Sequence, residues 1–361
     1  MFSLERGFLP AVDPLQKFPV ASPLSVLDEL GHDLPSLLYD GGFRKRIENC
    51  RIPAWQEPED PSQRLGQLHL YYVRVGFLAS AYINQVGQPI ANILPANLAT
   101  PLCHVCKLLS RPPILSYDGY ALYNWKRFDP AAPVALGNID TIQNFVHLYD
   151  EHWFILVHVE IEAIAAEILS AVDQIADALP ANDEANVNAG LKTIGNALWR
   201  QVAVLRRIPE KMDPALYYKT FRPYIRFFER VVYEGVDAQP LDYRGETGAQ
   251  SSIMPLLVAL MKIPHQRSML TDHLADMQNF MPAEHWAVIA AARQLSPLRS
   301  MADKDAYNNI LEAMATFREI HYGFAYEYIH TRVTDPRGTG GTPYMQWLKQ
   351  LIDETRAHKI A

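Results

Sequence analysis

The residues able to do chemistry in this sequence include a histidine on an apolar helical stripe near the C-terminus. Five residues recur there at helical spacing on one face: Phe317, Ile320, His321, Phe324 and Tyr328. His330 lies nine positions after His321, about 180° around the helix, and so faces away. A neutral imidazole on a buried face can donate to a metal ion or to haem iron. It can equally be a core histidine that hydrogen-bonds to a carbonyl group, and the helix alone leaves both interpretations open.

A second histidine has the same setting. Phe154, Val157, His158 and Ile161 form another apolar stripe at helical spacing. Glu162 follows His158 by four positions, about one helical turn, and could pair with it. One interpretation is therefore a purely structural histidine–glutamate pair. The other is that two buried histidines on separate helices flank a metal or a cofactor.

An arginine lies within an aromatic cluster. Four aromatic residues surround it at helical spacing: Tyr217, Phe221, Tyr224 and Phe228. Arg222 comes directly before Pro223, which interrupts the hydrogen bonds of a helix and restricts the preceding residue. We therefore expect Arg222 at a kink among aromatic rings, where its planar guanidinium could bind a carboxylate through two hydrogen bonds. The alternative is a surface arginine that packs only its aliphatic stem.

Two glycine-bearing loops and one cysteine pair are further candidates. The segments GETGAQSS (residues 245–252) and GTGGT (residues 338–342) each precede an expected helix. The first N–H groups of a helix favour an anionic group, although neither loop matches the common nucleotide-binding motifs, which need a preceding strand. The CHVC segment (residues 103–106) has no second CxxC pair, and lysine follows it where a haem-attachment motif needs histidine. We therefore interpret CHVC as packing.

Strand-like alternation of apolar and polar residues is almost absent from the sequence. Helices must therefore position the candidate site residues. Residues 1–60 are rich in proline and are expected to form an irregular arm with short helices. The expected helices cover residues 65–86, 139–148, 153–179, 186–208, 214–233, 252–262, 265–279, 283–294, 304–331 and 343–357. We therefore predict an all-α protein with a small N-terminal domain (residues 1–113) and a large helical domain (residues 114–361).

The 361-residue chain has the composition of a globular protein, with 49% apolar and 20% charged residues. Its net charge of −7 argues against a nucleic-acid-binding protein, which needs a basic face. No apolar stretch reaches membrane-spanning length, and the N-terminus lacks a basic segment followed by an apolar run, so we expect no membrane span and no secretory signal. Three cysteines, an odd number, argue against a disulfide framework and favour the reducing cytoplasm.

Several segments, in this order, resemble the indoleamine 2,3-dioxygenase family. They are LPANLATPLCHVCKLLSRPPILSYDGYALYNWK (residues 94–126), HWFILVHVEIEA (152–163), YYKTFRPY (217–224), GAQSS (248–252), REIHYGFAYEYI (318–329) and GTGGT (338–342). The resemblance spans most of the chain, and the set is specific when its members occur together. It implies a small N-terminal domain and a large all-helical domain that holds haem b.

The resemblance also implies roles for individual residues. It makes His321 the proximal ligand of the haem iron and Arg222 the partner of the substrate carboxylate. The other implied residues are Tyr117, Phe154 and Tyr217 around the indole, Thr247 and Gly248 in a loop beside the haem, and Thr339 in the loop that closes on the amino-acid end of the substrate. One position departs from the pattern, because many animal and fungal members carry serine where this chain has His158. The related tryptophan 2,3-dioxygenases place a distal histidine near the indole N–H.

The implied activity is haem-dependent cleavage of the indole C2–C3 bond of L-tryptophan by O2, which gives N-formylkynurenine. His158 would then act in the catalytic site by accepting a hydrogen bond from the indole N–H. An electron donor that keeps the haem ferrous is an implied partner. The alternatives are the same scaffold acting on another indole or inserting one oxygen atom, a haem or gas sensor without turnover, and a purely structural helical protein. A sensor would need neither Arg222 nor a closing GTGGT loop.

Overall fold

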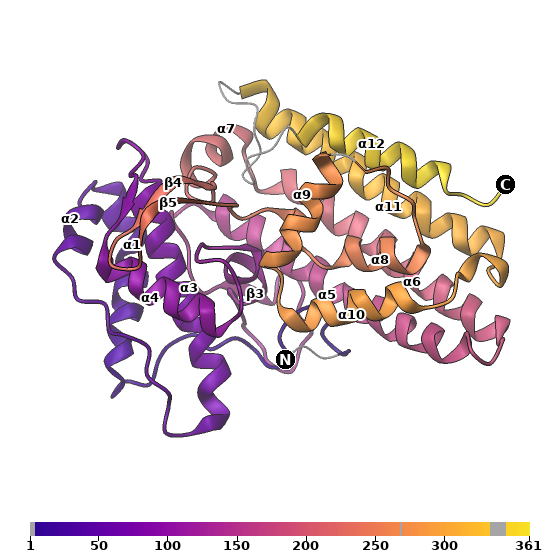
Figure 1. Cartoon of the computed structure of the whole chain (residues 1–361), viewed down its shortest axis with the longest axis horizontal. Coiled ribbons are helices and arrows are strands. Elements are labelled where there is room, and N and C mark those ends of the chain that lie inside the picture. The colour runs from indigo at the N-terminus through magenta and orange to yellow at the C-terminus, as the bar shows by residue number, and fades with distance from the viewer. Residues whose placement is uncertain (1–3, 268, 333–343) are drawn as a thin grey trace.

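The structure is a computed structural model that describes residues 4–267, 269–332 and 344–361. Helices dominate these residues, which confirms the prediction of an all-α protein (Figure 1). In chain order the helices are α1 (Val26–Tyr39), α2 (Phe43–Glu48), α3 (Arg64–Ile83), α4 (Ala96–Leu108), α5 (Tyr149–Ala178), α6 (Glu184–Leu205), α7 (Pro214–Leu216), α8 (Ile253–Met261), α9 (Met269–Met277), α10 (Ala283–Gln294), α11 (Lys304–Phe324) and α12 (Tyr344–Ala357).

Short strands form two small sheets between the helices. The strands are β1 (Ile93–Leu94), β2 (Trp125–Arg127), β3 (Ile139–Thr141), β4 (Phe228–Tyr233) and β5 (Asp237–Tyr243). Strand β4 pairs with β1 in parallel and with β5 in antiparallel orientation, whereas β2 pairs with β3 in antiparallel orientation. The strands are minor additions to a helical protein.

The prediction of one helix over residues 214–233 is wrong. Helix α7 leads into a π-helical turn, Tyr217–Phe221, and the chain turns at Arg222 before β4 begins. The residues of β4 are rich in β-branched and aromatic side chains, and Gly235 has a φ angle of +75° in the turn that follows. Such a run followed by a glycine turn favours a hairpin, and this preference overrides the helical spacing of the aromatic residues.

The prediction of a helix over residues 139–148 is also wrong. The segment begins with β3 and continues as an irregular loop before α5. The buried carboxylate of Glu151 accepts the backbone N–H groups of Phe145 and Val146 at 2.9 Å each. A side chain therefore satisfies the backbone groups that a helix would otherwise have paired.

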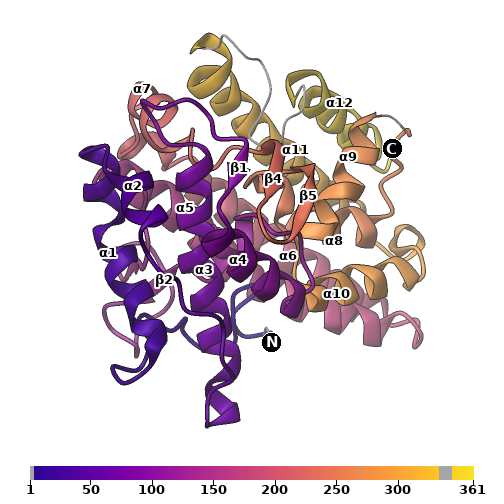
Figure 2. The ribbon, with the colours of Figure 1, turned by 60° about the vertical axis from the view of Figure 1, so that its left-hand side comes forward.

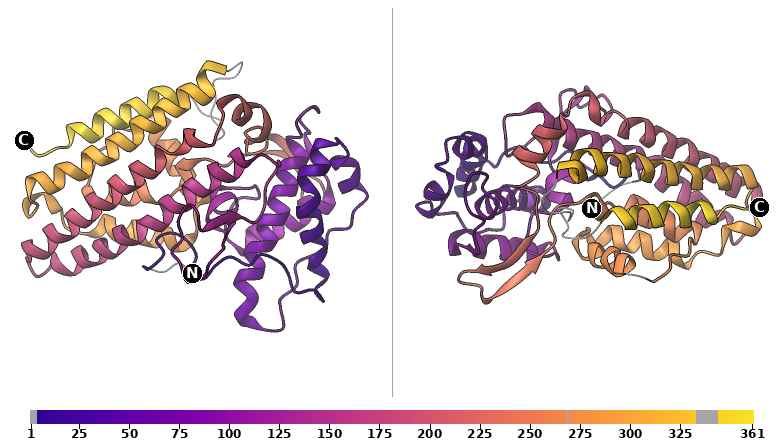
Figure 3. Two further views of the ribbon diagram at one scale, coloured as in Figure 1. Left: turned by 180° about the vertical axis from the view of Figure 1, so that it is seen from behind. Right: turned by 90° about the horizontal axis from the view of Figure 1, so that it is seen from above.

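The long helices begin where the sequence supplies a cap. The Asp183 carboxylate accepts the Asn186 N–H at the start of α6, and the Asp303 carboxylate accepts the Ala306 N–H at the start of α11. Such caps satisfy N–H groups that have no partner inside the helix. Helices α5, α6, α11 and α12 then lie alongside one another in an elongated bundle, with the C-terminus at one end (Figure 3).

The buried apolar side chains form two clusters. The first packs α1, α3 and α4 together with residues up to Val159 and part of β4. Figure 2 shows these three helices next to one another on the left of the view. The second fills the bundle of α5, α6, α8, α10 and α11. Residues 114–139 contribute to the first cluster, and the boundary between residues 113 and 114 stays a prediction.

Two further features are the lengths of the apolar helices and the state of the cysteines. No helix within the described parts of the chain is both long and apolar enough to cross a membrane. Cys50, Cys103 and Cys106 are all free thiols, and the last of them is buried in α4. The CHVC segment thus lies within a helix, as its interpretation as packing requires.

Candidate active site

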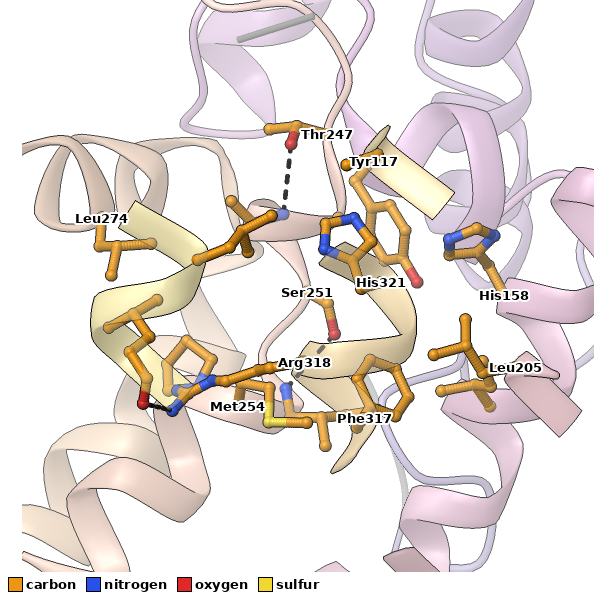
Figure 4. Close-up of a pocket in the computed structure, with 18 of the residues that line it drawn as sticks. Tyr117, His158, Leu205, Thr247, Ser251, Met254, Leu274, Phe317, Arg318 and His321 are labelled. Carbon is orange, nitrogen blue, oxygen red and sulfur yellow. Dashed lines mark hydrogen bonds between the residues drawn. The ribbon is translucent and has the colours of Figure 1, made fainter. Parts of the chain in front are cut away.

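A cavity of about 780 Å³ lies within the helical bundle, bordered by α5, α6, α8 and α11 and by the loop before α8 (Figure 4). This volume is in the usual range for small-molecule and cofactor sites. Three π-helical segments adjoin the cavity, namely Asp118–Leu122, Tyr217–Phe221 and Ala325–Ile329. Tyr217 and Tyr328 reach the wall from the second and third of these segments, and Tyr117 reaches it from the position directly before the first. Wide helical turns of this kind are frequent at functional sites.

His321 lies in the wall of this cavity, on α11. Part of the surface of His321 is accessible, so the residue counts as exposed. The ring nevertheless lies deep in the protein, and this burial lowers its pKa to about 4, while the nearby His158 lowers the pKa further. The two observations agree because the accessible part of the ring faces the cavity and not the outer solvent. His321 is therefore neutral at pH 7 and can offer a nitrogen lone pair to a ligand in the cavity.

His330 has a different environment. It follows α11 in a short 3-10 turn, is exposed, and stacks on Tyr326 with 5.5 Å between the ring centroids. It is not part of the cavity wall as the structure describes it. The placement of the two histidines agrees with the helical-phase argument, which selected His321.

His158 reaches the same cavity from α5. Its Nδ1 lies 2.7 Å from the carbonyl oxygen of Phe154. Because a carbonyl can only accept, Nδ1 carries the proton and Nε2 carries a lone pair. Burial lowers the pKa of His158, so the ring is neutral at pH 7. Figure 4 shows the rings of His158, His321 and Tyr117 directed toward the same space.

The alternative interpretation of His158, a structural pair with Glu162, is wrong. The buried carboxylate of Glu162 instead accepts hydrogen bonds from Tyr117 Oη at 2.8 Å and from Ser251 Oγ at 2.6 Å. Burial raises the pKa of Glu162 to about 7. Glu162 thereby ties α5 to the two loops that complete the cavity wall, while the imidazole of His158 stays available to a ligand.

Aromatic side chains form one flank of the cavity around Phe154. The ring of Phe154 lies 4.6 Å from the His158 ring and 5.6 Å from the Tyr217 ring. Tyr117 meets His158 edge-on at 6.0 Å, and Tyr217 meets Tyr328 at 5.7 Å. The structure thus brings together three predicted aromatic residues, and their flat, apolar surfaces suit a planar ring.

The loop before α8 supplies another part of the wall. Thr247 caps the short 3-10 turn Gly248–Gln250 by accepting the Ala249 N–H at 3.4 Å, and both Thr247 and Gly248 line the cavity. Gly245, two positions earlier, allows the chain to pass close to the turn after Arg222, because an added Cβ would lie 2.4 Å from the Ile225 oxygen. Backbone contact therefore fixes this loop against the neighbouring turn.

Two predicted residues are not brought into the wall by the described structure. Arg222 caps the end of the π-helical turn that carries Tyr217, and its guanidinium lies over the Tyr218 ring at 5.2 Å. It is not among the described lining residues of the cavity. Thr339 lies outside the described residues.

Sequence reasoning missed the charged residues of the described wall, and the two that are buried are Arg318 and Glu246. Arg318 lies one helical turn before His321, lines the cavity, and donates from Nη1 to the Leu351 oxygen at 3.1 Å and to Thr355 Oγ1. Burial lowers its pKa to about 10. Glu246 lines the cavity directly before Thr247. The i, i+3 spacing from His321 would have found Arg318, whereas the sequence holds no comparable signal for Glu246.

The donor set of the cavity suits a prosthetic group that brings most of its own metal ligands. Within the described ranges no three histidine, cysteine or acidic side chains gather in a way that could hold a bare metal ion. A neutral histidine such as His321 in the wall of a large, mostly apolar cavity fits haem, because the porphyrin supplies the equatorial ligands and the protein needs to supply only one more. The fold and the site thus define an all-helical protein with a cavity for a haem-sized group.

Comparison with known proteins identifies the family. The family model described as indoleamine 2,3-dioxygenase matches residues 1–336, and the chain therefore belongs to this family of haem-dependent oxidoreductases. Indoleamine 2,3-dioxygenase 2 of Homo sapiens is 31% identical over 98% of this chain and 93% of its own length. Indoleamine 2,3-dioxygenase 1 of Rattus norvegicus is 27% identical over 95% of this chain and 91% of its own. A protein named myoglobin from Haliotis madaka is 26% identical over 98% and 96%.

Proposed function

We propose that this protein binds haem b through His321 and uses O2 to cleave the C2–C3 bond of L-tryptophan, giving N-formylkynurenine. The observation that carries the proposal is the pair of neutral histidines, His321 and His158, on one cavity with an aromatic flank. When bound, the haem supplies the oxygen chemistry, while the protein orients the substrate and excludes water.

The haem is proposed to be held by residues of α11. His321 offers the iron its protein ligand, and Arg318 offers a buried cation to a haem carboxylate. The burial of a cation is costly, and among the described residues the charge of Glu354 offsets part of this cost for Arg318. A haem carboxylate in the cavity would offset more of it. The loop that contains Thr247 and Gly248 is proposed to lie beside the haem.

The substrate is proposed to be oriented by groups at its two ends. Phe154, Tyr117 and Tyr217 hold the flat indole, and Nε2 of His158 accepts the indole N–H. Arg222 is proposed to pair with the carboxylate, and Thr339 to close on the same end. Support for Arg222 is its position five residues after Tyr217, at the end of a π-helical turn that borders the cavity.

Two other properties belong to this proposal. A ferrous haem needs an electron donor, whose identity the proposal leaves open. Three free thiols are compatible with work in the reducing cytoplasm.

A second candidate function is reversible binding of O2 without turnover. It is favoured by the relatives from Haliotis madaka and Haliotis diversicolor that are named myoglobin, which are 26% and 25% identical over 98% of this chain. A third candidate is oxygenation of another indole on the same scaffold.

One experiment separates these candidates. The reduced, haem-loaded protein is mixed with L-tryptophan without oxygen and then exposed to O2. We expect the absorbance of N-formylkynurenine to rise, with a product mass two oxygen atoms above that of tryptophan. A protein that binds O2 reversibly and leaves tryptophan intact would support the second candidate and contradict the proposal.

His158 provides a test of how the ring is oriented. We expect His158→Ser to retain activity but to bind L-tryptophan less well and to discriminate less against 1-methyltryptophan, which lacks the N–H donor. The reason is that a hydrogen bond from the N–H to Nε2 fixes the ring, and a misplacement of about 1 Å can cost on the order of 100-fold in rate. The measurement is the ratio of the two turnover rates in both proteins. If the ratio is the same in both, His158 does not contact the indole nitrogen.

A further inference from the structure

Glu246 is a buried carboxyl group in the cavity wall to which the proposed function gives no role. Only 3% of its surface is exposed. Within the described part of the chain, no donor hydrogen-bonds to its carboxyl oxygens, and burial raises its pKa to about 8. The group is therefore mostly a neutral carboxylic acid at pH 7. A buried polar group without a partner is costly, which makes it a candidate for contact with a ligand.

The backbone holds Glu246 in place. Its N–H donates to the Ile225 oxygen at 3.1 Å, next to the close approach that only glycine allows at position 245. On the other side, Thr247 is fixed as the cap of the following turn. The backbone at Glu246 is thus already ordered, so that binding of a ligand needs no further ordering of the loop.

The position of Glu246 relates it to the aromatic flank. Burial raises the pKa of Tyr117, and the charges of Glu162 and then of Glu246 raise it further. Burial likewise raises the pKa of Tyr120, where the charges of Glu151 and then of Glu246 add to the rise. The Gln250 side chain joins the two segments, because its Oε1 accepts the Tyr117 N–H at 2.8 Å and its Nε2 donates to the Gly245 oxygen at 2.9 Å, directly before Glu246. The Tyr117 ring contacts His158, and the Tyr120 ring lies 6.3 Å from that of Phe154. These are the residues proposed to hold the indole ring.

The position of its loop indicates which part of a ligand Glu246 meets. Arg318 and Lys262, two cations of the same wall, lie on α11 and directly after α8, whereas Glu246 lies on the loop that the Gln250 side chain joins to Tyr117. Tyr117 is proposed to hold the indole ring. We therefore place Glu246 at the ring end of a bound amino acid.

We propose that Glu246 is a specificity-determining residue that hydrogen-bonds a hydroxyl or amino group on the six-membered ring of an indole substrate. The inference rests on the proposed function, because it takes the indole to lie against Phe154 with its N–H at His158. A carboxylic acid can both accept and donate, so either substituent satisfies it. A methyl group of similar size leaves the carboxyl group buried without a partner. Sites of this kind discriminate strongly between a ligand that can form the hydrogen bond and one that cannot.

The test compares dissociation constants, measured without turnover from the change in haem absorbance of the oxygen-free holoprotein. The ligands are 5-hydroxy- and 6-hydroxy-L-tryptophan, each set against the methyl compound with the same substitution. We expect the wild type to bind at least one hydroxyl compound about tenfold more tightly than its methyl partner. Glu246→Ala should bring that ratio close to one, and Glu246→Gln should keep part of it.

Two controls make the outcome specific. Glu167→Ala changes an exposed carboxylate on α5 and should leave the ratio as in the wild type. The thermal midpoint of the haem-free Glu246→Ala protein should be equal to or above that of the wild type, because the substitution removes a buried carboxyl group without a partner. A clearly lower midpoint would identify a structural carboxyl group and overturn the inference.

Different results would contradict the role of Glu246 and the proposed dioxygenase activity. A wild type without hydroxyl preference, or an unchanged ratio in Glu246→Ala, overturns the role of Glu246 even if L-tryptophan is cleaved. A hydroxyl preference that Glu246→Ala removes supports the role even if no indole is cleaved, and then the proposed dioxygenase activity alone is wrong.

Discussion

Replacing His321 with alanine is expected to abolish haem binding with a histidine-ligated spectrum. His321 is neutral because burial lowers its pKa to about 4, and its ring faces the cavity. His158, the other neutral histidine of this wall that the proposal uses, lies on α5 and is assigned to the substrate, so α11 would lose its ligand for the iron. The measurement is the haem content and absorbance spectrum of the purified variant, with circular dichroism to show that the helices remain.

The matched control is the other histidine of the same helical region. His330→Ala should take up haem with the wild-type spectrum, because His330 is exposed and contacts Tyr326 outside the cavity. The opposite result, with His330→Ala losing the spectrum and His321→Ala retaining it, would contradict both the helical-phase argument and the assignment of the cavity.

The sequence was sufficient to predict the parts of the site that lie on long helices. On such a helix, positions three and four apart share a face, so apolar neighbours already showed that His158 and His321 point inward. The structure places both in the wall of one cavity. Because α5 and α11 are strongly periodic, errors of a few residues at their ends did not disturb the phase of these histidines.

The parts that could not be predicted depend on contacts between distant segments. Glu162 follows His158 by one turn, which suggested a local pair, but Tyr117 and Ser251 approach it from elsewhere in the chain and take its carboxylate. Local spacing cannot reveal such partners. The hairpin of β4 and β5 was missed for a related reason, since aromatic residues at helical spacing hid the strand preference of the residues that follow.

Glu246 illustrates the same limit for a functional group. In the sequence it is an acidic residue in a polar, glycine-bearing loop, where exposure is the usual outcome. Only the packing of that loop against the turn after Arg222 buries it in the cavity wall. Burial, and with it the raised pKa, is thus a consequence of tertiary structure and not of the local sequence.

Arg222→Ala is expected to raise the KM for L-tryptophan strongly while changing the KM for tryptamine, which lacks the carboxylate, only slightly. Losing one partner of a buried charge pair costs on the order of 2–5 kcal/mol, which corresponds to roughly 30-fold to several thousand-fold in affinity. Arg222→Lys should show an intermediate loss, because lysine keeps the charge but not the planar fork. The measurement is steady-state kinetics with both compounds.

The result also decides between two positions for this arginine. The structure describes its guanidinium over the Tyr218 ring and not in the cavity wall, so the proposed role requires the side chain to turn toward a bound carboxylate. Lys219→Ala removes an exposed cation from the same π-helical turn and should leave both KM values unchanged. If Arg222→Ala raises the two KM values equally, the arginine only packs on Tyr218, and the carboxylate must bind to another cation of the site.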